Sequence, residues 1–179
     1  MTIVVHTSSA DQTRAVAAGV AGLARAGDVV ILVGDLGAGK TAFAQGFGAA
    51  LGVTDPITSP TFTLARRYQG RLILHHLDVY RLGSVDEALD LALPELIDSD
   101  SVTLVEWGDT ILPALPQDLL EIRLTFGPGD DDRVIALAPG GPRWTARSDA
   151  LARALDSVGL DGGAESGAED EGEREVRSC

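Results

Sequence analysis

Residues 34–41 read GDLGAGKT and match the pattern G-x-x-x-x-G-K-[ST] at its four fixed positions, Gly34, Gly39, Lys40 and Thr41. An apolar run, DVVILV, precedes this stretch, and a segment with helical spacing, TAFAQGFGAALG, follows it. The pattern is typical of a loop that connects a buried strand to a helix and wraps around phosphate groups. Glycine is needed because it permits close backbone approach and torsion angles barred to other residues. We therefore expect this loop to bind phosphate.

Lys40 is the only lysine among the 14 lysine and arginine residues of the chain. A lysine ammonium is a compact point charge, whereas the planar fork of arginine is too broad for the space that such a loop leaves. We expect Lys40 to neutralise the β- and γ-phosphates of a nucleotide and Thr41 to bind Mg²⁺ through its hydroxyl. The loop residues expected to contact the nucleotide are Gly34, Asp35, Leu36, Gly37, Ala38, Gly39, Lys40 and Thr41.

The base of the nucleotide is better predicted as adenine than as guanine. Guanine-specific proteins with this loop usually read their base with Asn-Lys-x-Asp. The chain has no asparagine and no second lysine, so that motif is absent from the sequence. ATP with Mg²⁺ is therefore the expected ligand pair.

Strand and helix signals alternate along the rest of the chain. Residues 9–12, SADQ, form a capping-box pattern in front of a helix. A short helix is expected over residues 84–93. Strand-like segments lie at residues 2–5, 61–68, 71–78, 101–106, 118–126 and 133–138. These signals predict an α/β protein, a P-loop NTPase-like three-layer fold with a mixed, partly parallel sheet.

Composition limits both the domain organisation and the partners. We expect a single domain over residues 1–157 and a disordered acidic tail over residues 158–179, where Gly, Glu and Ser dominate. The net charge of -13 disfavours direct, non-specific binding of nucleic acid. No apolar run is long enough to span a membrane, and the first residues do not resemble a secretory signal. A cytoplasmic location without membrane contact is expected.

Two carboxylates end strand-like segments and compete for the metal. RLILHHLD ends in Asp78, and SVTLVE ends in Glu106. One could ligate Mg²⁺ while the other orients the attacking water, and spacing alone does not assign these roles. His75 and His76 occupy adjacent strand positions and face opposite sides, so we expect one packed, one exposed and no shared metal site.

Four segments together, GDLGAGKT, SPTFTL, HLDVYRL and LVEWGD, resemble the TsaE family, which comprises small bacterial ATPases of the tRNA threonylcarbamoyladenosine modification system. The likeness covers residues 7–138. It implies that Thr41 and Glu106 contact Mg²⁺ and that Asp78 lies in the active site. It also makes Thr61 and Trp107 expected site residues. The residues expected to take part in catalysis are thus Lys40, Thr61, Asp78 and Glu106.

The resemblance also implies contacts and partners that the residues alone do not indicate. Nucleotide contacts outside the loop are expected near the first helix, at Asp11 or Thr13, and on the late hairpin, at Arg133. The expected partners are the two proteins of the threonylcarbamoyl-transferase complex, of the TsaB and TsaD type, with tRNA involved indirectly. The chain would bind this complex and sustain its turnover, hydrolysing ATP only weakly when alone.

Two other functions compete with this regulatory ATPase. A small-molecule P-loop kinase would use an arginine-rich lid, for which Arg66, Arg67, Arg71 and Arg81 are candidates. A binding module that uses ATP only as an ordering ligand would bind the nucleotide without hydrolysing it. Transfer of phosphate to an added metabolite would indicate the kinase, and release to water would indicate the ATPase.

Overall fold

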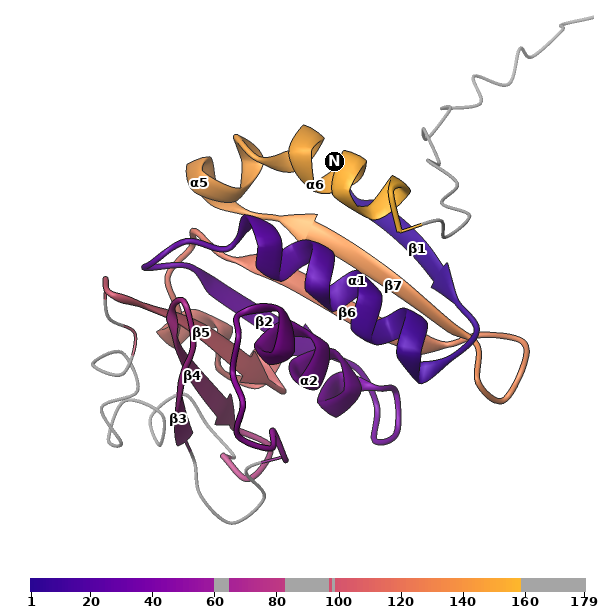
Figure 1. Ribbon diagram of the computed structural model, residues 1–179, viewed down its shortest axis with the longest axis horizontal. Coiled ribbons are helices and arrows are strands. Elements are labelled where there is room, and N and C mark those ends of the chain that lie inside the picture. The colour runs from indigo at the N-terminus through magenta and orange to yellow at the C-terminus, as the bar shows by residue number, and fades with distance from the viewer. Residues whose placement is uncertain (60–64, 83–96, 98, 159–179) are drawn as a thin grey trace, which may run out of the picture.

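A single sheet organises the part of the chain that the computed structural model describes, namely residues 1–59, 65–82, 97 and 99–158. Its seven strands run in the order β1-β7-β6-β2-β5-β4-β3 (Figure 1). The strands are β1 (Ile3–Thr7), β2 (Val29–Val33), β3 (Ala65–Gln69), β4 (Ile73–Asp78), β5 (Ser101–Glu106), β6 (Leu120–Phe126) and β7 (Arg133–Pro139).

The four central strands are parallel, and the outer strands are antiparallel. β2 pairs in parallel with β5 and β6, and β4 pairs in parallel with β5. The pairs β3–β4, β6–β7 and β1–β7 are antiparallel. This arrangement confirms the expected mixed, partly parallel sheet. It also brings the carboxyl ends of β2, β4, β5 and β6 to one edge, where open α/β sheets usually bind their ligands.

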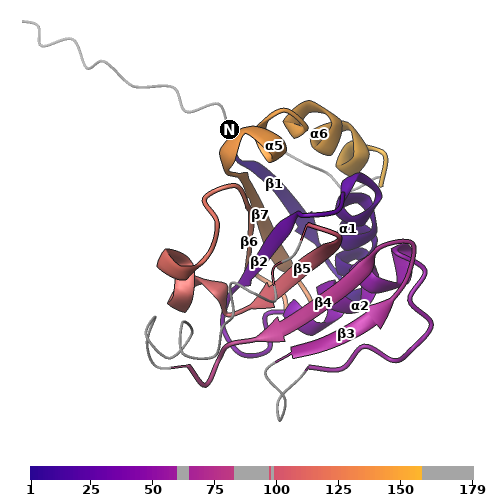
Figure 2. The ribbon, with the colours of Figure 1, turned by 90° about the vertical axis from the view of Figure 1, so that its left-hand side faces the viewer.

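Helices cover one face of this sheet (Figures 1 and 2). They are α1 (Ala10–Leu23), α2 (Lys40–Ala50), α5 (Gly141–Thr145) and α6 (Ser148–Asp156). Their apolar side chains join the larger core, which includes Phe43 of α2 and the buried Trp144 of α5. On the opposite face, within the described residues, the 3₁₀ helix η1 (Gly108–Ala114) packs over β2 and β5. Its Ile111 joins apolar side chains of these strands in a second, smaller core. The expected three layers are therefore present.

The expected helix after residues 9–12 is α1, and its first turn has the predicted cap. The Ser9 hydroxyl accepts a hydrogen bond from the Gln12 amide, and the Gln12 side chain accepts one from the Ser8 amide. This fixed start directs Val16, Val20 and their neighbours into the core beside α2. The same cap places Thr13 at the helix base, close to the loop that precedes α2.

The other sequence expectations divide into three groups. The strands expected at 71–78, 101–106, 118–126 and 133–138 are confirmed as β4, β5, β6 and β7. η1, α5 and α6 were not predicted from the sequence. The helix expected over residues 84–93, the acidic tail from residue 159 and the start of the strand expected at 61–68 lie outside the described residues. Within the described part of the chain, no helix has both the length and the apolar character needed to cross a membrane.

Candidate functional site

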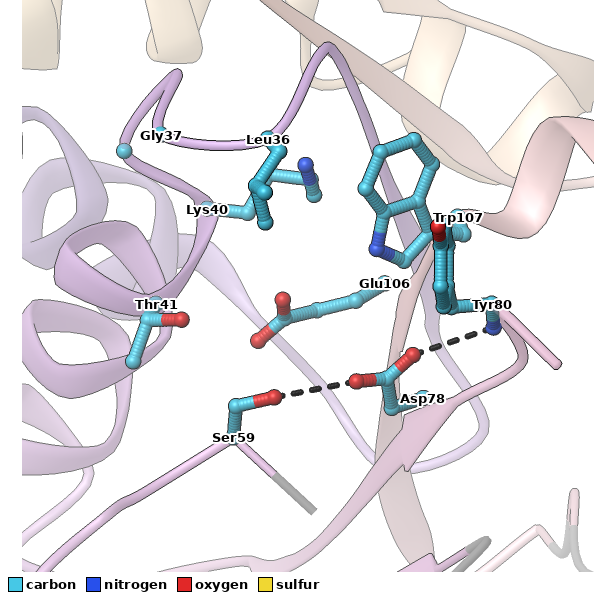
Figure 3. A pocket seen from close by; sticks show the side chains of 10 residues that line it. Leu36, Gly37, Lys40, Thr41, Ser59, Asp78, Tyr80, Glu106 and Trp107 are labelled. Carbon is cyan, nitrogen blue, oxygen red and sulfur yellow. Dashed lines mark hydrogen bonds between the residues drawn. The ribbon is translucent and has the colours of Figure 1, made fainter. Parts of the chain in front are cut away.

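A cavity of about 420 Å³ opens at the carboxyl ends of β2, β4 and β5 (Figure 3). Four parts of the chain form its walls: the loop before α2 together with the first turn of that helix, Ser59, the end of β4 and the end of β5. The lining residues are Leu36, Gly37, Gly39, Lys40, Thr41, Ser59, Asp78, Tyr80, Glu106 and Trp107.

The loop of residues 34–41 takes a shape that requires glycine. Gly34 has φ +147°, and a Cβ atom there would lie 2.3 Å from the carbonyl oxygen of Leu124. Gly39 has φ +106° and precedes α2 without a side-chain cap on the helix. The amino end of α2 therefore opens at the cavity, where backbone N–H groups and the helix dipole favour an anion.

Lys40 is held inside the loop. Its Nζ donates to the carbonyl oxygens of Gly34 and Asp35 at 2.6 and 2.9 Å, and it lies 3.6 Å from the centroid of the Trp107 ring. The residue is only 5% exposed. Burial lowers the pKa of Lys40, although the nearby carboxylates, led by Glu106, oppose this shift. These short contacts around a single nitrogen explain why a compact ammonium is needed here.

Trp107 forms one wall of the cavity through an unusual backbone conformation. Its φ of 63° is the one positive value among the non-glycine residues that the structure describes. The Trp107 amide donates to Leu32 of β2, and the Tyr80 ring lies 4.9 Å from the Trp107 ring. Strained torsion angles of this kind cost about 1–3 kcal/mol and cluster at functional sites.

The two predicted carboxylates lie side by side, because Asp78 pairs with Glu106 in the register of β4 and β5. Both oxygens of Asp78 accept hydrogen bonds, one from the Ser59 hydroxyl at 2.9 Å and one from the Tyr80 amide at 3.0 Å. The Glu106 carboxylate is buried and points toward Thr41 (Figure 3). Asp78 thus fastens surrounding loops, whereas Glu106 faces the start of α2.

A second, smaller cavity of about 70 Å³ shares Gly39 with the first. Its walls include Thr13 and Arg133, which places both of these predicted residues beside the loop. Arg133 donates to the Ala38 carbonyl at 3.2 Å, and its guanidinium lies 4.7 Å from the Phe126 ring. Asp11, by contrast, lines neither cavity. Its exposed side chain forms an ion pair with Arg14 at 2.8 Å.

The structure thus brings most of the predicted site residues together. Thr61 lies outside the described residues. Three residues that line or support the cavity were not predicted: Ser59, His76 and Tyr80. The two-residue spacing of His76 and Asp78 could have indicated His76, because alternate residues of a strand share a face. Tyr80 lies beyond the end of β4, so this spacing does not apply to it. One of His75 and His76 was expected to be packed and the other exposed, and only the packed member of the pair is observed as expected. His76 is fully buried, and His75 is half-buried.

Comparison with known proteins assigns the family. The family model described as "Threonylcarbamoyl adenosine biosynthesis protein TsaE" matches residues 7–135. The chain belongs to the TsaE family. A TsaE of Bacillus subtilis is 43% identical over 149 residues, which cover 83% of this chain and 92% of that protein. A TsaE of Streptomyces coelicolor is 43% identical over 129 residues, covering 68% of this chain and 86% of its own.

A solved structure supports the same assignment. The crystal structure of Bacillus subtilis YdiB matches with a TM-score of 0.75 and 38% sequence identity, covering 86% of this chain and 95% of that one. The α/β fold of this chain is therefore shared with that protein. The resemblance inferred from the four sequence segments is confirmed at the level of the family.

Proposed function

We propose that this chain is a Mg²⁺-dependent ATPase that binds the tRNA threonylcarbamoyladenosine-forming enzyme complex and sustains its turnover. Membership of the TsaE family supports the role in threonylcarbamoyladenosine biosynthesis. One observation carries the ATPase part of the proposal: a buried lysine at the amino end of α2 shares a cavity with two carboxylates. Such a cavity combines binding of phosphate with groups able to hold a cation and orient water.

The loop residues fit a nucleoside triphosphate. The close approach of Gly34 to Leu124 leaves no room for a side chain, so the backbone itself forms the cradle. The uncapped amino end of α2 would donate to phosphate oxygens. Lys40 would exchange its contacts with the Gly34 and Asp35 carbonyls for the β- and γ-phosphates, which satisfy a cation better than neutral carbonyls do.

The donor set also fits Mg²⁺. Thr41 offers a hydroxyl and Glu106 a carboxylate, which are hard oxygen ligands of the type that Mg²⁺ prefers. Among the described residues, no group of three or more His, Cys, Asp or Glu side chains could hold a metal ion. Remaining ligands would therefore come from phosphate and water, as is usual for Mg²⁺. When bound, the ion would neutralise the charge that develops on the phosphates.

Asp78 has a different task in this proposal. Its carboxylate is fixed from two sides, by Ser59 and by the Tyr80 amide, and it retains lone pairs that face the cavity. A carboxylate held in this way can accept a hydrogen bond from water and orient it for attack. Ser59 also starts the segment that contains Thr61, so Asp78 would couple hydrolysis to that segment.

The proposed partners are two proteins of the TsaB and TsaD type, and tRNA would be engaged through them. The proposed location of the chain is the cytoplasm. The acidic net charge of -13 supports indirect engagement, because a surface of that sign repels a phosphate backbone. The kinase alternative receives less support. Arg71, one of its candidate lid residues, donates to the backbone carbonyls of Ala21 and Ala24, next to the end of α1, rather than to the cavity.

The decisive experiment measures phosphate release from ATP and Mg²⁺ by the purified chain, alone and with its own organism's TsaB and TsaD proteins and tRNA. We expect slow release alone, faster release with both partners, and formation of threonylcarbamoyladenosine. A rate of phosphate release that does not change when the partners are added would contradict the proposal, as would transfer of phosphate to an added metabolite. Tight ATP binding without hydrolysis, even beside the partners, would indicate a binding module.

A further inference from the structure

His76 of β4 is the one fully buried histidine among the described residues, and it contacts the proposed metal-binding carboxylate. Its side chain is 0% exposed, and Nε2 lies 2.9 Å from Oε1 of Glu106, which is itself 3% exposed. A carboxylate that binds a cation can only accept a hydrogen bond, so Nε2 is the donor in this contact when Glu106 serves the proposed site. The contact joins β4 to β5 directly behind the cavity.

The second ring nitrogen of His76, Nδ1, indicates why a histidine rather than an apolar residue is useful at this position. Nδ1 has no hydrogen-bond partner among the described residues. Around it lie buried residues of the larger core, with Leu104 opposite His76 in the sheet and the Tyr68 ring centroid 6.5 Å away. Burial of an unpaired polar atom is unfavourable, because the atom loses its hydrogen bonds to water. An apolar side chain would avoid that cost, but it could not donate to Glu106.

The register of β4 and β5 determines the side from which His76 contacts Glu106. His76 lies opposite Leu104, two residues before Glu106, so His76 and Glu106 share the face of the sheet that carries α2. Fixing Oε1 from this side restricts a side chain that otherwise has several rotatable bonds. The carboxylate then remains turned toward Thr41, as Figure 3 shows.

We propose that His76 is a positioning residue that holds Glu106 toward Thr41 and thereby sets the affinity of the site for Mg²⁺. This inference rests on the proposed function, because it concerns the cation of that same site. Hydrogen-bond partners of metal-binding carboxylates commonly change metal affinity by about 10–100-fold when they are removed. Phosphate binding by the loop and Lys40 does not involve His76 and should persist without it.

The test compares three variants, His76→Gln, His76→Asn and His76→Leu. The amide nitrogen of glutamine reaches about as far as Nε2 of histidine, whereas that of asparagine reaches only about as far as Nδ1. Gln and Asn therefore form a matched pair that differs in reach toward Glu106. ATP binding is measured by calorimetry in EDTA and across a Mg²⁺ titration, and thermal unfolding is recorded for each variant.

We expect the Gln variant to keep the Mg²⁺ midpoint of the unmodified chain within about 3-fold, and the Asn and Leu variants to raise it about 10–100-fold. ATP binding in EDTA should not change. Equal Mg²⁺ midpoints in all folded variants would overturn the inference, as would a parallel loss of ATP binding in EDTA. If the Leu variant does not fold, the Gln and Asn pair decides. If the unmodified chain binds ATP without any Mg²⁺ dependence, the proposed function itself fails.

Discussion

Buried charged side chains lie at both ends of β2, but they are paired with each other at one end and line a cavity at the other. At the amino end, Asp28 is 1% exposed, and its two oxygens accept hydrogen bonds from Arg147 at 2.7 and 2.8 Å. The Arg25 amide donates to the same carboxylate, and the Arg147 guanidinium also lies 4.0 Å from the Trp144 ring. Every charged group there has a partner within the protein.

At the carboxyl end, the charges face a cavity instead. Lys40, Asp78 and Glu106 line one space with Thr41, and burial lowers the pKa of Lys40. Trp107, next to Glu106, takes a strained backbone conformation. A buried ion pair whose members satisfy each other holds one part of the chain against another, whereas buried charges that face a cavity remain available to a ligand.

We expect the strongest effect from disrupting the ion pair at the amino end of β2. Replacing Arg147 by Met leaves Asp28 buried without its main partner and should lower the free energy of unfolding by about 3–5 kcal/mol. The turnover of the folded fraction should not change, because the pair lies at the opposite end of β2 from the cavity. Chemical denaturation and phosphate release measure the two properties separately.

The double variant Asp28→Ala with Arg147→Met serves as the control for this prediction. It removes both charges, so it should be more stable than the single Arg147→Met variant. A double variant that is destabilised by the full sum of the two single substitutions would show that the two side chains do not act as a pair.

Substitution of Lys40 at the carboxyl end of β2 should instead lower activity and leave stability nearly unchanged. Lys40→Met keeps an unbranched side chain of nearly the same length but removes its charge, and it should lower ATP hydrolysis by about 100–1000-fold. Thermal stability should stay close to that of the unmodified chain. Lys40→Arg is the matched control: it restores the charge but not the compact shape, so it should be inactive as well. Substantial activity in the arginine variant would refute the argument from the size of the ammonium.

The smallest expected effect is a dependence of stability on pH. The pKa of Lys40 is lowered on folding, so between the folded value and the unfolded value of 10.5 the unfolded chain binds more protons. The free energy of unfolding should therefore rise with pH through this window, relative to the Lys40→Met variant. Denaturation of both chains at pH values from 8 upward measures the difference. A difference that stays constant or falls would contradict the lowered pKa.

Much of the fold could be predicted from local patterns. The apolar run before residues 34–41, the capping box at Ser9 and the alternation over residues 118–126 each correspond to an observed element. These signals are local, because backbone torsion preferences and side-chain periodicity depend on neighbouring residues. α5 and α6 were not predicted, although α6 buries Leu151 and Leu155 in a helical spacing that offered a signal.

The site divides in the same way. Residue type and spacing alone identified the glycine-rich loop of residues 34–41, its single lysine and two strand-end carboxylates. Which groups meet became visible only in the folded chain: His76 contacts Glu106 across 30 residues, and Asp28 contacts Arg147 across 119. Strand order and helix packing set those distances, and both arise from burying apolar surface over the whole chain, which no local stretch of sequence specifies.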